Sequence, residues 1–190
     1  PLYFCCTFDG KNCTAFNTRT RCISSGHDDY AGVSLSNTGN RKIFIGWMSN
    51  CQYAMLVPTE KWRSAMTLPR NLSLQKSGDK YLLTSKPVVE LNTVAELPII
   101  LNDVEAGRYD VSAKTGELAG PAELKLNTEK IETFSIIFSN AKNEKLIVVY
   151  DKAKNNLYVD RTQTGNVSFE KGFAEKHDAH RLSYKAKQHL

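Results

Sequence analysis

Short apolar runs separated by turn residues occur along the whole chain, and they predict a protein built almost entirely of β-strands. The runs are rich in β-branched and aromatic residues and only a few residues long, which is typical of strands. No segment has the sustained 3.6-residue period of a long amphipathic helix, and residues 88–96 have room for only one or two helical turns. The predicted strands are residues 42–48, 66–68, 81–84, 133–138, 145–150 and 157–159.

Two runs differ in how many of their faces they are expected to bury. The run LIVVY at residues 146–150 is apolar at every position, which favours a strand covered on both faces. Residues 108–112 alternate instead, with Tyr109 and Val111 on the same face. This alternation predicts a strand with one side in water.

Turn signals and composition indicate how the chain is divided. Hairpin turns are predicted at Asp9-Gly10, at Thr38-Gly39-Asn40 and at Ser77-Gly78-Asp79. A change of composition near residues 85–100, a stretch that contains Pro87 and Pro98, predicts a boundary. The preceding half is rich in Trp, Cys and Arg motifs, and the following half is rich in Lys, Glu and Asn. We therefore expect one domain over residues 1–84, a linker over 85–100 and a second domain over 101–190.

Charge and hydropathy exclude some classes of protein. The net charge of +5 comes from 25 Lys and Arg against 20 Asp and Glu, and these residues are spread along the chain. Nucleic-acid binding is not predicted, because binders of that class usually carry a basic face or a dense Lys/Arg run. No apolar run approaches the roughly 20 residues that span a bilayer, so no membrane span is predicted. No signal peptide is recognisable, and the natural N-terminus is expected upstream.

The five cysteines lie at positions 5, 6, 13, 22 and 51. An odd number confined to one region does not make a disulfide framework, so these residues are interpreted as small buried apolar side chains. A disulfide from Cys5 or Cys6 to Cys22 stays open as an alternative. No metal site and no cofactor is predicted, because adjacent strand residues such as Cys5 and Cys6 point to opposite faces. The pair His177 and His180 also lacks companion ligands nearby.

The stretch 26–74 contains the candidate chemistry. It reads GHDDYAGVS, then KIFIGWMSN, then QYA, then VPTEKWRSAMTLPRNLSL. Aromatic faces beside carboxylates suit sugar rings, whose C–H faces stack on aromatic rings. Composition alone indicates only possible carbohydrate contact, and an aromatic β-core explains it equally well.

The order and spacing of these four words resemble the late propeller segment of glycoside hydrolase family 32, the family of invertases, levanases and inulinases. Downstream, YDKAKNNLYVDRTQTGNVSFEKGF resembles the C-terminal β-sandwich of the same family. The resemblance extends from about Phe8 to about Phe173. It implies an all-β fold, the final part of a five-bladed β-propeller followed by a truncated β-sandwich.

The resemblance also implies a reaction and a substrate class. Members of the family cleave β-fructosidic bonds of sucrose or of the fructans levan and inulin, with retention, using carboxyls about 5 Å apart. The family's three catalytic carboxylates lie in N-D-P, R-D-P and E-C words, none of which occurs here. We therefore expect no catalytic residue in this chain and place the carboxylates upstream. The alternative is a non-catalytic remnant or a carbohydrate-binding β-module.

The resemblance names three candidate substrate-binding residues, Trp47 of the GWM word and Tyr30 and Asp28 of the D-x-YA word. For Trp47, a place in the propeller core is the competing interpretation. Trp62 and Arg63 are expected to hold the closing blade together. A buried arginine of this kind needs a carboxylate partner.

Departures from the family words lower the expected stacking area for a sugar. Cys22, Leu35 and Cys51 stand where aromatic residues are common, and Met55 replaces a small polar residue. The expected partner is a fructose-containing carbohydrate. Because an incomplete propeller has open sheet edges, the chain is expected to need the missing upstream blades or to self-associate. The family suggests a secreted or periplasmic protein.

Overall fold

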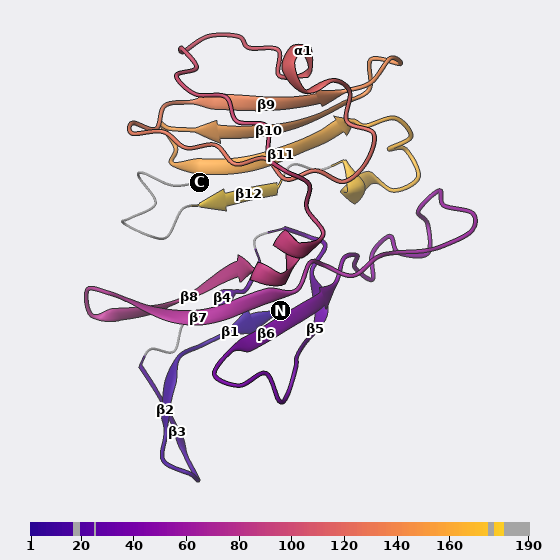
Figure 1. Ribbon diagram of the computed structural model, residues 1–190. Helices are drawn as coiled ribbons and strands as arrows, with labels where there is room; N and C mark the ends of the chain where they lie inside the picture. Colours follow the sequence, from indigo (N-terminus) through magenta and orange to yellow (C-terminus); the bar gives the residue numbers. More distant parts are fainter. Residues whose placement is uncertain (17–19, 25, 175–176, 181–190) are drawn as a thin grey trace.

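The chain folds into two four-stranded antiparallel sheets, one from each half of the sequence (Figure 1). A computed structural model describes residues 1–16, 20–24, 26–174 and 177–180. The last ten residues of the predicted second domain lie outside the described part, as do residues 175 and 176. In Figure 1 the sheet of the C-terminal half lies above the sheet of the N-terminal half.

The N-terminal half contains two short strand pairs and the first large sheet. The first four strands are β1 (Leu2–Tyr3), β2 (Cys6–Phe8), β3 (Cys13–Ala15) and β4 (Arg21–Cys22), which pair as β1 with β4 and β2 with β3. The large sheet has the order β5-β6-β7-β8, with strands β5 (Tyr30–Ser34), β6 (Lys42–Trp47), β7 (Arg70–Ser77) and β8 (Lys80–Pro87).

All three predicted turns join antiparallel strands. The turns connect β2 to β3, β5 to β6 and β7 to β8. Each has its glycine in the left-handed region, where a side chain would be strained: φ is +99° at Gly10, +64° at Gly39 and +59° at Gly78. The glycines therefore set where the chain reverses.

Strand β6 confirms the strand predicted at residues 42–48 and has two partners on one side. Its first residues, Lys42 to Phe44, pair with β7. Farther along, Trp47 forms a single bridge with Met66, and the amide of Met48 donates to the carbonyl of Ala65 at 2.8 Å. The strand predicted at residues 66–68 is thus reduced to one bridge beside β6.

The second half begins with η1 (Val89–Thr93), which confirms the short helical segment predicted after residue 88. It continues with α1 (Ser112–Thr115), and its sheet has the order β12-β11-β10-β9, formed by β9 (Phe134–Ser139), β10 (Lys145–Asp151), β11 (Asn156–Gln163) and β12 (His177–His180). The short η2 (Lys171–Phe173) precedes β12. Among the described residues, no helix is long and apolar enough to cross a membrane.

Strand β10 matches the prediction for LIVVY, because it lies between β9 and β11 and none of its residues is fully exposed. The predicted strand at residues 108–112 is wrong. This segment is a loop that leads into α1, and Tyr109 and Val111 are 44% and 42% exposed. Alternation alone did not make a strand here because no neighbouring strand supplies a hydrogen-bonding partner.

The cysteine interpretation also needs correction. Cys6 and Cys13 form a disulfide across the β2–β3 hairpin, which the sequence analysis did not predict. Cys22, the proposed partner in the open alternative, is a free and exposed thiol, and so is Cys51. Cys5 is free and half-buried. The pairing follows from the hairpin register. Cys13 lies opposite Phe8, and Cys6 lies two residues before Phe8 on the same face of the strand, so the two cysteines are diagonal neighbours.

The exposed edge of the first sheet generates a prediction. Strand β5 is the terminal strand of that sheet, and its Val33 is 56% exposed. Open edges with apolar side chains pair with other chains. We expect the mean mass measured by static light scattering to rise above 21.3 kDa as concentration increases.

Two lysine variants localise this association. Val33→Lys puts a charge on the edge and is expected to lower the mean mass. Leu97→Lys removes a side chain that is 94% exposed in a loop, away from any strand edge, and is expected to leave the mean mass unchanged. A parent chain that stays monomeric over the whole concentration range contradicts the prediction.

Candidate functional site

The candidate site is built around three consecutive residues, Asp28, Asp29 and Tyr30, which contact three different parts of the chain. Tyr30 begins β5 and lies directly opposite Trp47 of β6. Their ring centroids are 6.4 Å apart with an interplanar angle of 60°, an edge-to-face arrangement. Tyr30 is 53% exposed and Trp47 is half-buried, so the pair presents an aromatic surface to solvent.

A β-bulge directly after Tyr30 contributes to the direction of this ring. The register of β5 on β6 shifts between Tyr30 and Val33, and Ala31 has a φ of +46°. Bulges of this kind re-aim a side chain next to functional sites. Gly32 completes the bulge, because a Cβ at this position would collide with the ring of Phe44.

Asp29 points into the protein, where it forms an ion pair with Arg70 at the start of β7. The distance between Asp29 Oδ2 and Arg70 Nη2 is 2.6 Å, and the two side chains are 3% and 18% exposed. Arg70 also lies over the ring of Phe44 at 5.2 Å. Gly46 leaves space for the carboxylate, because a Cβ there would collide with Asp29 Oδ1. The glycine of the GWM word is therefore needed to make room for Asp29 of the preceding word.

Asp28 faces the other half of the molecule. Its Oδ1 accepts hydrogen bonds from the Tyr53 hydroxyl at 2.5 Å and from Asn50 Nδ2 at 3.1 Å. Its Oδ2 pairs with Nη1 of Arg161 on β11 at 2.9 Å. Asp28, a predicted sugar contact, is thus surrounded by three protein donors.

Arg161 uses all three of its nitrogen atoms. Besides Asp28, its Nη2 donates to the Tyr53 hydroxyl at 2.8 Å, and its Nε donates to the carbonyl of Phe173. The guanidinium also lies 4.0 Å from the centroid of the Phe173 ring. The sequence analysis interpreted Asp160-Arg161 as structural but did not predict that Arg161 reaches the first sheet, 133 residues away in sequence from Asp28. No local pattern carries that signal.

Aromatic packing surrounds this bridge. The Tyr53 ring, which is almost wholly buried, packs edge-on against Phe173 at 5.5 Å and against Phe169 at 6.5 Å. Beside it, Gln52 Nε2 donates to Glu170 Oε2 at 3.0 Å. The QYA word of the first half therefore contacts the FEKGF segment of the second half. We call Asp28, Tyr53, Arg161 and Phe173 the interhalf cluster.

The interhalf cluster shifts the ionisation of Tyr53. Burial raises the pKa of the Tyr53 hydroxyl, and its hydrogen bond to the Asp28 carboxylate raises that pKa further. The neighbouring Arg161 acts in the opposite direction, but the net shift is upward from the ordinary value near 10. The neutral phenol is therefore the form that bridges Asp28 and Arg161.

The roles expected of Trp62 and Arg63 are only partly met. Arg63 fastens the turn after β6, because its Nη1 donates to the carbonyls of Met55 and Val57 at 3.1 and 2.9 Å. Trp62 is 63% exposed and does not pack a blade together in this structure. The buried arginine with a carboxylate partner is Arg70, at the other end of the same word.

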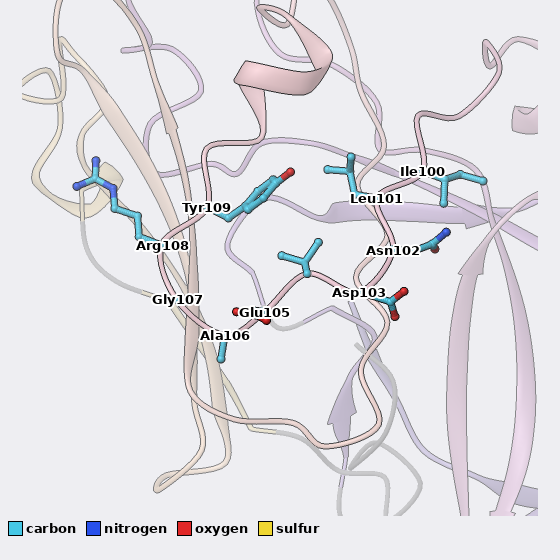
Figure 2. Close-up of a pocket in the computed structure, with 10 residues that line it drawn as sticks. Ile100, Leu101, Asn102, Asp103, Glu105, Ala106, Gly107, Arg108 and Tyr109 are labelled. Atoms are coloured by element: carbon cyan, nitrogen blue, oxygen red, sulfur yellow. The ribbon is translucent and has the colours of Figure 1, made fainter.

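The described part of the chain offers little else as a site. A hollow of about 550 Å³ is lined by residues 100–109 of a single loop (Figure 2). It contains none of the predicted sugar contacts and brings together no distant elements. No group of three or more His, Cys, Asp or Glu that could hold a metal ion occurs among the described residues.

This arrangement suits contact with a ligand better than bond cleavage. Retaining glycoside cleavage needs one carboxylate free to attack and a second carboxyl free to protonate. Asp28 and Asp29 are instead each paired with an arginine. Tyr30 and Trp47 are the groups that remain open.

Two family models match the chain. The model of the glycosyl hydrolases family 32 N-terminal domain matches residues 1–87, and that of the family 32 C-terminal domain matches residues 73–190. The chain belongs to glycosyl hydrolase family 32. The predicted all-β fold, propeller strands followed by a β-sandwich, is confirmed by its structural neighbours in this family.

Named relatives of this family 32 chain act on fructans. It is 31% identical over 180 residues to a levanase of Bacillus subtilis, covering 90% of this chain and 27% of the relative. It is also 31% identical over 185 residues to an extracellular exo-inulinase of Aspergillus awamori, covering 90% of this chain and 34% of that enzyme. The chain thus spans about a third of the length of these relatives.

Solved structures of the family have the same fold. The crystal structure of the Aspergillus awamori exo-inulinase matches with a TM-score of 0.68 and 28% identity, over 97% of this chain and 38% of that one. The β-fructofuranosidase of Schwanniomyces occidentalis, complexed with fructosyl-erythritol, matches with a TM-score of 0.59 and 19% identity, over 95% and 39%.

The buried ion pair gives the first prediction for this family 32 chain. Arg70→Met removes the partner of a carboxylate that is 3% exposed, and leaving such a charge unpaired costs about 3–5 kcal/mol of unfolding free energy. Urea unfolding monitored by circular dichroism measures the change. As a control, Arg41→Met breaks the exposed Arg41–Glu90 pair and is expected to leave the midpoint close to that of the parent. Equal midpoints for the two variants would argue against the pair's role.

The Tyr53 hydroxyl gives a second prediction. Its pKa is raised in the folded chain, so the folded state holds this proton at a pH where the unfolded chain has begun to lose it. The stability that depends on this proton is fully present below pH 10 and declines as the pH rises toward the folded pKa. Nuclear magnetic resonance of ring-labelled tyrosine is expected to show one tyrosine ionising after the solvent-exposed ones. Tyr53→Phe should remove that resonance, and a late resonance that persists in this variant contradicts the assignment.

Proposed function

We propose that this chain is the late-propeller and C-terminal part of a retaining β-fructosidase that cleaves β-fructosidic bonds of fructans. Its catalytic carboxylates would lie outside these 190 residues, in the remaining two thirds of the relatives' length. The observation that carries the proposal is the pairing of Tyr30 from the D-x-YA word with Trp47 from the GWM word on adjacent strands. The two words that suggest sugar contact thus meet at one open aromatic surface.

Within this proposal, Trp47 and Tyr30 contact the fructosyl unit. The C–H faces of a sugar stack on aromatic rings, and the sugar's hydroxyl groups form hydrogen bonds with polar groups of the protein. Asp28 lies two residues before Tyr30, but its oxygens already accept from Asn50, Tyr53 and Arg161. Its proposed contribution to binding is therefore mainly to hold the start of β5.

The proposal includes the division of the chain and its partners. Residues 1–84 are assigned to the propeller, 85–100 to a linker and 101–190 to the sandwich. The two family models, which meet at residues 73–87, support a division in this region. The exposed edge strand β5 supports a requirement for further propeller strands, supplied by upstream sequence or, failing that, by a second copy.

A fluorescence titration tests the sugar site. The chain has two tryptophans, so Trp62→Phe leaves Trp47 as the sole emitter. Fructo-oligosaccharide is expected to change the emission of this variant saturably. In the matched control Trp47→Phe, only the exposed Trp62 emits, and no saturable change is expected. A flat titration of the Trp62→Phe variant contradicts the assignment of Trp47 and Tyr30.

Fructose release from sucrose, inulin and levan tests where the chemistry resides. The chain alone is expected to release none. Turnover by the purified chain would place the catalytic carboxylates within it and would overturn this part of the proposal.

A further inference from the structure

We propose that Arg161 is a positioning residue for the aromatic pair Tyr30–Trp47, so that the C-terminal half sets the geometry of the sugar surface. This inference rests on the proposed function for the role of that pair. It extends the proposal by assigning to a residue of the C-terminal half an effect on the fructosyl-contacting surface of the other half. The rings that the Arg161 guanidinium lies over are those of Tyr53 and Phe173, and Arg161 acts on the pair through Asp28 and Tyr53.

The first step of the argument is that Arg161 holds both chain segments that flank the aromatic pair. Asp28 lies two residues before Tyr30, and its Oδ2 pairs with Arg161 Nη1 at 2.9 Å. Tyr53 lies six residues after Trp47, and its hydroxyl accepts from Arg161 Nη2 at 2.8 Å. One guanidinium therefore joins the segment that enters β5 to the turn that leaves β6.

The second step is that the hydrogen bonds of the Arg161 guanidinium form a closed and rigid arrangement. The Tyr53 hydroxyl, which accepts from Arg161, also donates to Asp28 at 2.5 Å, so that three side chains form one ring of hydrogen bonds. The third nitrogen of Arg161 donates to the Phe173 carbonyl, and the Phe173 ring covers the guanidinium at 4.0 Å. A planar guanidinium with all its nitrogens engaged fixes orientation as well as distance.

The third step concerns what else holds the pair in place. Ladder pairing of β5 with β6 is interrupted by the bulge that follows Tyr30. Tyr30 is the terminal residue of an edge strand and is 53% exposed. Since the register of β5 on β6 is broken directly after this residue and resumes only at Val33, its direction also depends on the residues before it, and Asp28 is held from the C-terminal half.

The experiment uses the full chain in the Trp62→Phe background, so that Trp47 alone reports. Arg161→Gln removes the charge and the fork, and Asp28→Asn weakens the same contact from the other side. Lys152→Gln is the control, because it breaks the Lys152–Glu132 pair within the C-terminal half without touching the first sheet. The thermal midpoint of each variant is measured first. Acrylamide quenching of Trp47 and fructo-oligosaccharide affinity are then measured at a temperature well below the lowest midpoint.

If Arg161 positions the pair, Arg161→Gln and Asp28→Asn raise the quenching of Trp47 and weaken oligosaccharide binding by about tenfold, because small misplacements of a binding group have large effects. The double variant shows no more than the larger single effect, since both changes open one contact. Lys152→Gln matches the parent in both readouts.

A purely stabilising role gives a different result. Arg161→Gln would then lower the thermal midpoint but leave Trp47 quenching and sugar affinity at parental values below that midpoint, which overturns the inference. The quenching readout is independent of sugar binding. If the parent binds no oligosaccharide but Arg161→Gln still exposes Trp47, positioning by Arg161 stands and the proposed sugar site fails.

Discussion

The guanidinium of Arg161 joins two sheets that share no strand, and it lies at the centre of the contacts that hold the two halves together. Removing such a group and its carboxylate partner from water costs several kcal/mol per ion. The cost is offset here because each nitrogen of Arg161 has an acceptor and because Asp28 accepts from three donors. Because all these groups are hydrogen-bonded, the contact fixes the geometry between segments that are distant in sequence.

The neighbouring ion pair of Asp29 and Arg70 has fewer of its hydrogen bonds formed. Asp29 Oδ1 and Arg70 Nε are buried without a hydrogen-bond partner among the described residues. The single contact of 2.6 Å therefore carries most of the compensation for two buried charges, together with the stacking of Arg70 on Phe44. The two adjacent aspartates thus differ in how completely their arginine partners are hydrogen-bonded. Asp28 is held by a fully bonded arginine across the halves, and Asp29 by an incompletely bonded one within the first sheet.

Sequence patterns predicted those parts of the fold that depend on local chemistry. The glycine turns at Gly10, Gly39 and Gly78 and strands such as β6 and β10 were all expected, because a positive φ and a β-branched run are properties of a few adjacent residues. The strand β7 was not predicted, since only Leu72 and Leu74 alternate among polar residues there.

The features that the sequence analysis missed or predicted wrongly depend on how separate segments of the chain pair. The alternating segment at residues 108–112 did not become a strand, because a strand needs a partner as well as a pattern. The disulfide between Cys6 and Cys13 depends on hairpin register, which cysteine counting ignores. The role of Arg161 could not be predicted either, because its partner Asp28 lies 133 residues earlier. The resemblance located Tyr30, Trp47 and Asp28, but their geometry required the tertiary structure.

The glycines of the recognised words show why the words belong together as one unit. Gly32 of the YAG word leaves room for the ring of Phe44, and Gly46 of the GWM word leaves room for the carboxylate of Asp29. Phe44 in turn lies under the guanidinium of Arg70, from the TLPR end of the last word. A side chain at either glycine would displace a group that another word supplies. The spacing of these words is therefore a packing constraint, which brings Tyr30 and Trp47 onto adjacent strands.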